Sequence, residues 1–297
     1  MSGAPRRSGT VAVVGRPNAG KSTLVNALVG TKVAIVSDKP QTTRRRVLGI
    51  VTAPEGQLVF VDTPGLHKPL HRLNKVMMND ALEAIREVDV RLLVIDASEP
   101  GGGGDRYALG LLADAPHPRV AVLNKIDRID KSRLLPRMAE LGDSKVFDEI
   151  VPISALRGEG LDRLRTVLFA NLPEGDELYP VETVTMTAPR VHYGEVIREK
   201  LLTRTREEIP YGLGVVVEEV RDEPGKKLTV VTATIVVDKE NHKGIVLGAG
   251  GRLLKEAATE ARLELEAAFG RRFYLDLNVA ARPGWREDPR FLADLTS

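Results

Sequence analysis

The chain has no cysteine among its 297 residues, and aromatic residues make up only 4% of it. Without thiols it cannot form disulfides, thiolate metal sites or a cysteine nucleophile. Long apolar runs are also lacking, since none approaches the roughly 18 residues of a membrane-spanning helix, and the N-terminal MSGAPRRSGT has no signal-peptide core. We therefore expect a cytoplasmic globular protein whose only membrane contact would be peripheral, at the inner face of the cell membrane.

No excess of charge of either sign is present, because 43 basic residues face 41 acidic ones and the formal net charge is +2. Bulk charge therefore does not indicate nucleic-acid binding, and any such site must be a local patch. The length suits two domains, each able to bury a core of its own.

Apolar strand-like runs alternate with helical patterns over the first 170 residues. The predicted strands are 10–15, 45–53, 56–63, 90–98, 119–127 and 149–155, and the predicted helices are 21–30, 74–88, 101–115 and 160–172. This alternation predicts an α/β domain with a mostly parallel sheet and helices on both faces, in which ligands bind at the carboxyl ends of the strands. We assign it residues 1–175.

Residues 15–23, GRPNAGKST, match the phosphate-loop pattern G-x-x-x-x-G-K-[ST], with a predicted strand before them and a predicted helix after them. Backbone N–H groups in such a loop surround a β-phosphate at a helix N-terminus. Lys21 is expected to reach the β- and γ-phosphates, and Ser22 to bind Mg²⁺. The expected nucleotide contacts are Gly15, Asn18, Gly20, Lys21, Ser22 and Thr23.

Two further segments are expected to respond to the γ-phosphate. Asp62 in the DTPG sequence would hold the Mg²⁺ shell, and the Gly65 amide would sense the γ-phosphate. Residues 36–46 lack apolar periodicity and form the predicted first switch, with 62–75 as the second. Either Thr42 or Thr43 would add a hydroxyl to the metal. We assign Mg²⁺ to Ser22, Thr43 and Asp62, nucleotide contact to Thr42, and catalysis to Lys21, Asp62, Gly65 and Thr43.

The NKID sequence at 124–127 selects the base. A carboxylate accepts two parallel hydrogen bonds, and guanine offers N1–H and N2–H₂ in that geometry whereas adenine does not. Asp127 therefore predicts GTP and GDP as ligands, with Asn124 and Lys125 beside it and Ser154 and Ala155 covering the guanine. Four such motifs in this order resemble those of the translation-factor-related GTPases.

Leu66 follows Gly65, where Ras-like GTPases carry a glutamine that orients the attacking water. Leucine cannot hydrogen-bond water, so slow intrinsic hydrolysis is predicted. Asn18 is either a K⁺ ligand that offsets this loss or a residue that stabilises the loop. Arg44, Arg45 and Arg46 are either a solvated strand edge or a phosphate-contacting patch. A non-catalytic RNA-binding scaffold that holds nucleotide only for stability is the alternative function.

The element order changes beyond a Pro- and Gly-rich linker at 171–180. The predicted elements are a helix at 194–210, a hairpin of 212–222 with 227–239, a helix at 252–270 and a strand at 272–281. The glycine cluster at 248–251 lies between helical segments and lacks a following Lys-Ser/Thr pair, which excludes a second phosphate loop. It matches the G-x-x-G clamp of KH modules, which binds about four single-stranded nucleotides. We assign 176–297 to a smaller α+β type II KH domain, with RNA contacts from Gly248, Ala249, Gly250 and Gly251.

A GTPase domain followed by a KH domain closely resembles the Era family, which also shares the DTPGLHKP, TRTREEIPYG and NHKGIVLGAGG sequences and the Trp285-Arg286 pair. The resemblance implies binding to the 3′ region of 16S ribosomal RNA, a role in 30S subunit assembly and, we expect, a monomer. Two residues depart from the family pattern: its usual clamp lysine is Ala249 here, and its aspartate before the tryptophan is Gly284. Loss of the lysine removes a phosphate contact, which predicts somewhat weaker and less salt-sensitive RNA binding. Trp285 either stacks on a base or closes the edge of the domain.

Overall fold

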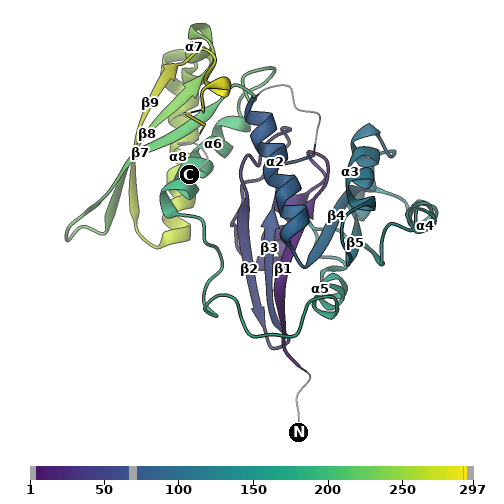
Figure 1. Cartoon of the computed structure of the whole chain (residues 1–297). Helices are drawn as coiled ribbons and strands as arrows, with labels where there is room; N and C mark the ends of the chain where they lie inside the picture. Colours follow the sequence, from purple (N-terminus) through teal and green to yellow (C-terminus); the bar gives the residue numbers. More distant parts are fainter. Residues whose placement is uncertain (1–4, 67–71, 290, 293–297) are drawn as a thin grey trace. The chain divides into compact units, whose positions relative to one another are not determined.

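The computed structural model describes residues 5–66, 72–289 and 291–292 (Figure 1). Two compact units make up the chain: the first ends at Met186 and the second begins at Thr187, with Ser37–Thr42 grouped with the second. Among the helices of these described residues, none is long and apolar enough to cross a membrane.

The first unit is built on a six-stranded sheet with the order β2-β3-β1-β4-β5-β6. Only β2 is antiparallel to its neighbour, and the other pairs are parallel, as the alternating pattern predicts. The carboxyl ends of β1, β3, β4 and β5 therefore meet at one edge of the sheet. The strands are β1 (Arg7–Val14), β2 (Val47–Ala53), β3 (Gly56–Asp62), β4 (Val90–Asp96), β5 (Arg119–Asn124) and β6 (Glu149–Pro152).

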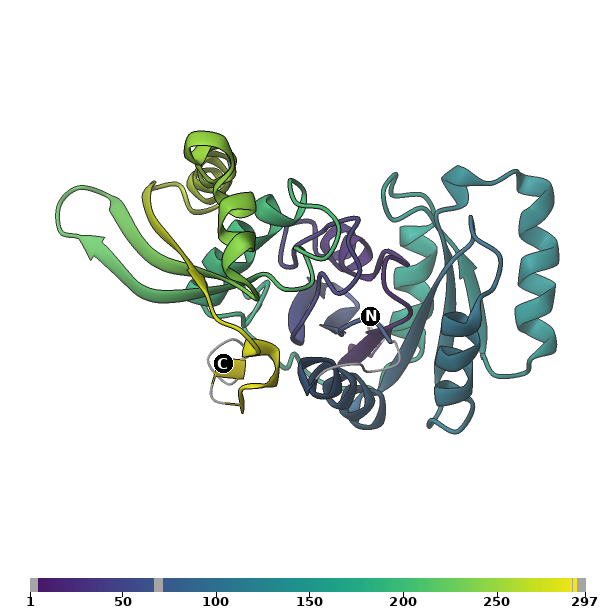
Figure 2. The same ribbon diagram turned by 90° about the horizontal axis from the view of Figure 1, so that it is seen from above.

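Helices cover both faces of this sheet, because alternate residues of each strand point to opposite sides (Figure 2). Val11 and Val13 of β1 belong to one core with Leu24 and Leu168, while Ala12 belongs to the other. Helices α1 (Lys21–Val29) and α5 (Leu161–Ala170) supply the first core, and α2 (Arg72–Glu87), α3 (Gly103–Ala113) and α4 (Leu134–Asp143) supply the second. The sequence analysis did not predict α4.

The segment after α5 is tied to the sheet rather than left as an open linker. Gln57, which is fully buried, accepts hydrogen bonds through Oε1 from the N–H groups of Leu178 and Tyr179, both at 2.9 Å. Further along, the Ile50 N–H on β2 donates to the Val184 carbonyl at 2.9 Å. The Ile50 bond occupies part of the exposed edge of β2, which would otherwise present unpaired backbone groups. The residues expected to open the second domain at 176 therefore belong to the first unit.

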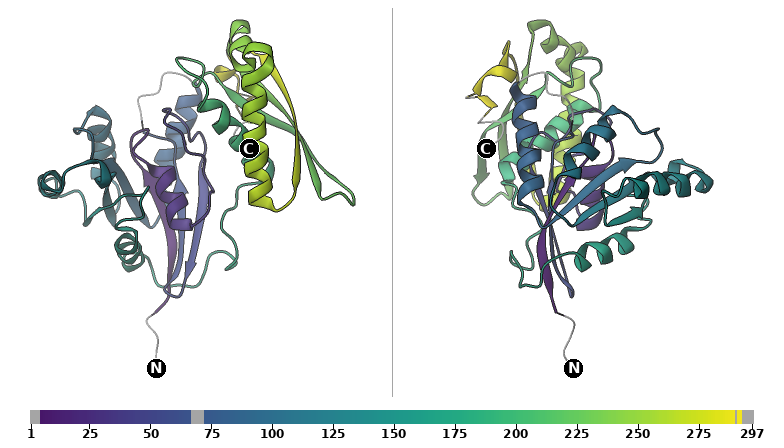
Figure 3. Two further views of the ribbon diagram at one scale, coloured as in Figure 1. Left: turned by 180° about the vertical axis from the view of Figure 1, so that it is seen from behind. Right: turned by 45° about the vertical axis from the view of Figure 1, so that its right-hand side comes forward.

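The second unit contains a three-stranded sheet with the order β7-β8-β9, covered by helices (Figure 3). The β7–β8 hairpin is antiparallel and β8 pairs with β9 in parallel. The elements follow the predicted helix–strand–strand–helix–helix–strand order. They are α6 (Pro189–Leu202), β7 (Gly214–Glu223), β8 (Leu228–Val237), α7 (Glu240–Leu247), α8 (Arg252–Phe269) and β9 (Arg272–Ala281).

The prediction for the first helix of this unit was wrong in its bounds, since 194–210 was expected and α6 spans Pro189–Leu202. Pro189 occupies the first helical turn, where its missing N–H costs no hydrogen bond. The helix buries Val196 and Leu201 against Val231 of β8 and Leu265 of α8. Its early start positions these apolar residues over the sheet.

Trp285 closes the core of the second unit. Its side chain is fully buried, its Nε1–H donates to the Gly212 carbonyl at 3.2 Å, and its ring meets Phe291 edge-on with centroids 5.6 Å apart. A buried indole with its N–H satisfied leaves no face for a stacked base. Of the two interpretations of Trp285, closure of the domain edge is confirmed.

Candidate nucleotide site and glycine clamp

The phosphate loop, residues 15–23, connects β1 to α1 at the carboxyl edge of the first sheet. Gly15 has φ 149° and Gly20 has φ 97°. A Cβ on Gly15 would lie 2.4 Å from the Val94 carbonyl oxygen, and one on Gly20 would lie 2.3 Å from Asn124 Nδ2. Both positions therefore require glycine, because the backbone conformation and the neighbouring atoms exclude a side chain.

Lys21 begins α1 and folds back over the loop. Its Nζ donates to the carbonyl oxygens of Gly15 and Arg16, both at 3.1 Å, and its side chain is buried. Burial lowers the pKa of Lys21 to about 8, although the charge of Asp62 opposes the shift. The ammonium is thus held inside the curled loop, where the phosphates of a bound nucleotide would lie.

A cluster of hard oxygen ligands lies beside the loop. Ser22 Oγ donates to Asp62 Oδ2 at 2.7 Å and is 2.8 Å from Thr43 Oγ1. Asp62 is fully buried, and its Oδ1 has no hydrogen-bond partner among the described residues. Burial raises the pKa of Asp62 to about 6, against the opposing effect of Lys21. A buried carboxylate with an unused oxygen next to two hydroxyls suits Mg²⁺, which prefers oxygen ligands and retains several waters.

The structure distinguishes the two threonines of the first switch. Thr43 Oγ1 reaches Ser22, whereas Thr42 Oγ1 donates to the Lys39 carbonyl at 2.6 Å within its own loop. The geometry therefore favours Thr43 over Thr42 as the threonine beside Ser22 and Asp62.

The same loop leads to Arg46, whose Nε donates to the Asp80 carbonyl of α2 at 3.1 Å. Arg46 is therefore neither on a solvated strand edge nor in a phosphate-contacting patch, the two predictions for these arginines, because its guanidinium binds α2.

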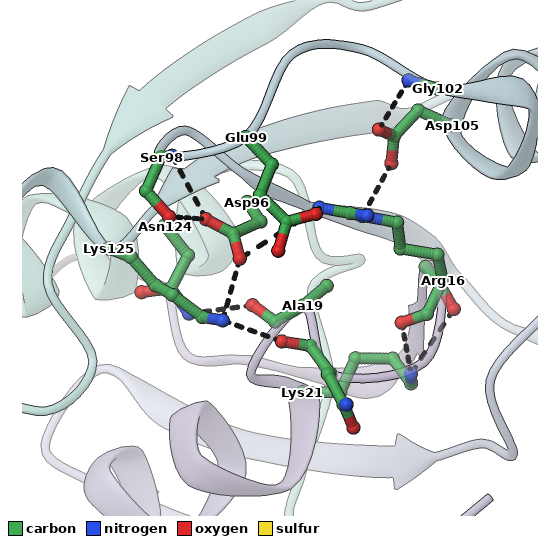
Figure 4. Close-up of polar contacts among 12 residues, drawn as sticks. Arg16, Ala19, Lys21, Asp96, Ser98, Glu99, Gly102, Asp105, Asn124 and Lys125 are labelled. Atoms are coloured by element: carbon green, nitrogen blue, oxygen red, sulfur yellow. Dashed lines mark hydrogen bonds and ion pairs between the residues drawn. The ribbon is translucent and has the colours of Figure 1, made fainter. Parts of the chain in front are cut away.

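Asn124 joins the phosphate loop to two other segments. Its Nδ2 donates to the Ala19 carbonyl at 2.9 Å (Figure 4), and its Oδ1 accepts the Ala155 N–H at 3.0 Å. The neighbouring Lys125 has φ 65° and donates from Nζ to the Asn18 carbonyl at 2.7 Å. The NKID segment is thereby bonded directly to the phosphate loop.

Asp127 follows with its carboxylate held in place. Ser154 Oγ donates to its Oδ1 at 2.6 Å, and Arg157 Nε lies 4.0 Å from its Oδ2. The hydrogen bond from Ser154 and the nearby cations hold the pKa of Asp127 below its ordinary value. The ionised carboxylate is the form that accepts two N–H bonds from a guanine edge.

Leu66 lies in the apolar core of the first unit, with 1% of its surface exposed, and its backbone N–H donates to the Gly15 carbonyl at 3.0 Å. Its side chain is thus packed among other apolar residues and cannot orient a water molecule. Gly65 is restricted as well, since a Cβ there would lie 2.8 Å from Pro17 N. The remainder of the predicted second switch includes residues 67–71, which lie outside the described residues.

In the second unit, the glycine cluster forms a tight turn between α7 and α8. Gly248, Gly250 and Gly251 all have positive φ, at 72°, 61° and 78°. A Cβ on Gly248 would meet the Leu253 side chain at 2.8 Å, whereas the position on Gly250 is open. Ala249 and Gly250 are exposed at the start of α8, so their backbone is open to a nucleic-acid phosphate.

Two known protein families match segments of this chain. The family described as 50S ribosome-binding GTPases matches residues 10–125, and the KH domain family matches residues 208–286. The chain is 45% identical to GTPase Era of Heliobacterium modesticaldum, over 96% of this chain and 95% of that protein. It is 42% identical to GTPase Era of Geobacter metallireducens, over 99% of both chains.

The chain belongs to the Era family of GTPases. Solved Era structures share its fold. One holds MgGDPNP and nucleotides 1506–1542 of 16S ribosomal RNA; it is 39% identical, with a TM-score of 0.95 and 98% of both chains covered. A variant of Aquifex aeolicus Era bound to GDP and AlF₄⁻ is also 39% identical, with a TM-score of 0.93 and 97% of this chain and 98% of that chain covered. The predicted fold class, a GTPase domain with a KH domain after it, is confirmed.

The sequence motifs did not reveal Asp96, at the end of β4, whose Oδ2 lies 2.6 Å from Lys125 Nζ. The available signal was its position, because a carboxylate that ends a buried parallel strand faces the ligand edge of the sheet.

Proposed function

We propose that this protein binds and hydrolyses GTP, binds 16S ribosomal RNA near its 3′ end, and acts in 30S subunit biogenesis as a cytoplasmic monomer. The observation that carries the proposal is that one phosphate loop is hydrogen-bonded to Asp62 through Ser22 and to the NKID segment through Ala19. The exposed glycine clamp of the second unit supplies an RNA site. The Era complex with MgGDPNP and 16S nucleotides 1506–1542 supports both activities.

The residues of the site have separate roles in nucleotide binding and hydrolysis. Loop N–H groups and Lys21 bind the phosphates, and the Gly65 amide senses the γ-phosphate. Ser22, Thr43 and Asp62 would hold Mg²⁺, which neutralises phosphate charge as it develops in the transition state. Catalysis of this kind depends on position and electrostatics, so it requires no side-chain nucleophile. The Leu66 side chain cannot hydrogen-bond the attacking water, so we expect a slow intrinsic rate.

Replacing Asp127 by asparagine tests the base assignment. The amide cannot accept both guanine N–H groups, so Asp127→Asn should weaken GTP binding by about 3 kcal/mol, more than a hundredfold. Binding of xanthosine triphosphate should improve, because its C2 oxygen accepts from an amide. Calorimetric titration with both nucleotides measures the exchange of preference. An unchanged GTP affinity would remove Asp127 from the base site.

The two threonines give a matched test of the metal site. Thr43→Ala should raise the Mg²⁺ concentration needed for half-maximal hydrolysis by about tenfold, the scale typical of a lost ligand or its support. Thr42→Ala removes a hydroxyl that, among the described residues, donates to the Lys39 carbonyl, and it should leave that concentration within about twofold. Hydrolysis is followed by phosphate release across a Mg²⁺ series. A stronger effect for Thr42→Ala would reverse the assignment.

We also propose that Asn18 helps hold a K⁺ ion that offsets the missing glutamine. A cation at the phosphates would stabilise the charge that develops during hydrolysis. Turnover in KCl should therefore exceed turnover in NaCl at equal ionic strength, and Asn18→Ala should abolish the difference. Equal rates in the two salts would restrict Asn18 to a role in loop stability. A rate too slow for multiple turnover in either salt would favour the scaffold function.

The RNA clamp is tested at Gly250, where the backbone must admit a phosphate. Gly250→Asp adds a negative side chain at an open position and should abolish binding of a 3′ 16S fragment. GDP affinity without RNA should stay within about twofold of wild type, because the substitution lies in the other unit. Undiminished RNA binding by the variant would place the RNA site elsewhere.

In the wild type, a non-hydrolysable GTP analogue should strengthen RNA binding relative to GDP.

A further inference from the structure

Asp96 is a buried carboxylate to which none of the nucleotide motifs assigns a role. It ends β4 with 2% of its surface exposed, and its Oδ2 accepts a hydrogen bond from Lys125 Nζ at 2.6 Å (Figure 4). The same Lys125 ammonium donates to the Asn18 carbonyl of the phosphate loop at 2.7 Å. One cation is therefore shared between a loop carbonyl and a carboxylate that ends a neighbouring strand.

The Asp96 carboxylate is itself fixed in orientation. Its Oδ1 accepts from the Ser98 backbone N–H at 2.9 Å and from Ser98 Oγ at 2.6 Å. Burial alone would raise the pKa of Asp96, but the hydrogen bonds from Lys125 and Ser98 outweigh it and hold the pKa below its ordinary value. The side chain is thus an ionised acceptor with little freedom to turn away from Lys125.

A second cation lies on the other side of this carboxylate. Arg16 of the phosphate loop places Nη2 3.9 Å from Asp96 Oδ2 and 2.6 Å from Glu99 Oε2, and its Nε lies 3.4 Å from Asp105 Oδ1. Asp96 therefore lies between a cation of the phosphate loop and a cation of the NKID segment. The arrangement connects the two segments that would hold opposite ends of one nucleotide.

We infer that Asp96 is a positioning residue for guanine nucleotide binding, which holds the Lys125 ammonium against the Asn18 carbonyl and so fixes the phosphate loop relative to the base-reading segment. The inference rests on the proposed role of residues 124–127. Lysine has a long flexible stem and a single point charge, so one carbonyl alone would not confine it. Two acceptors, one at the end of β4 and one in the phosphate loop, do confine it, and they order the site before the nucleotide arrives.

A positioning role of this kind predicts a specific kinetic pattern. Neither Asp96 nor Lys125 contacts the cation corner at Asp62, so the interaction acts on the ground state and the transition state equally. Asp96→Asn should weaken GDP and GTP binding by the same factor, about 10- to 100-fold for a lost charged hydrogen bond. The KM for GTP should rise while kcat remains within about twofold, as expected for uniform binding.

A double-mutant cycle separates this role from general stabilisation of the fold. Lys125→Met removes the ammonium, and adding Asp96→Asn to it should lower GDP affinity by no more than about twofold further. The matched control is Asp89→Asn, which replaces the carboxylate just before β4 that binds Thr10. That variant should lower the thermal unfolding temperature of the nucleotide-free protein and leave GDP affinity within about twofold.

If Asp96→Asn does not fold, Ser98→Ala gives the second measurement, because it removes the hydroxyl hydrogen bond that orients the carboxylate but keeps the charge of Asp96. It should weaken GDP binding by about 2- to 10-fold, and this loss should disappear in the Lys125→Met background. Wild-type GDP affinity in Asp96→Asn, or independent losses in the double variant, would overturn the inference. If Asp127→Asn exchanges the base preference while Asp96→Asn binds GDP as tightly as the wild type, only this inference is overturned. The base assignment then stands.

Discussion

The nucleotide site depends on how the carbonyl groups of one short loop are satisfied. Lys21 occupies the carbonyls of Gly15 and Arg16, and side chains from the NKID segment occupy those of Asn18 and Ala19. These bonds hold the loop in the curled form in which its N–H groups can surround a phosphate. The same bonds hold the start of the NKID segment, whose Asp127 carboxylate we propose reads the base. In the proposed function, phosphate binding and base selection therefore depend on one set of hydrogen bonds.

Parallel strands make this arrangement possible. Asp62, Asp96 and Asn124 end β3, β4 and β5, and the shared direction of these strands brings the three side chains to one edge of the sheet. Each lies among apolar strands, so each is buried and hydrogen-bonded rather than solvated. Burial favours the protonated form of both aspartates, and it raises the pKa of Asp62, which has an unused oxygen, to about 6. In Asp96 the hydrogen bonds from Lys125 and Ser98 outweigh burial and hold the pKa below its ordinary value.

Local pattern was sufficient to predict the sheet, the glycine positions and the helix order of the second unit, because each depends on periodicity or on positive φ within a few residues. Other features depend on distant partners. Thr42 and Thr43 are indistinguishable in sequence, and only the reach of Thr43 to Ser22 separates them. The segment around Leu178 has a linker's composition, yet Gln57 binds it to β3. Neither contact leaves a signal in a single sequence.

The proposed function implies that nucleotide state and RNA binding are linked in one chain. The segment that leads to the second unit is bonded to β2 and β3, and β2 continues from the first switch, so ordering of that loop can reach it. Linkage is reciprocal, and couplings of this kind are typically about 5- to 150-fold. The direct test is titration of a GTP analogue and of GDP with and without a saturating 3′ 16S fragment. The account predicts that RNA strengthens analogue binding relative to GDP by the factor with which the analogue strengthens RNA binding. Identical nucleotide affinities with and without RNA would contradict it and leave two independent domains.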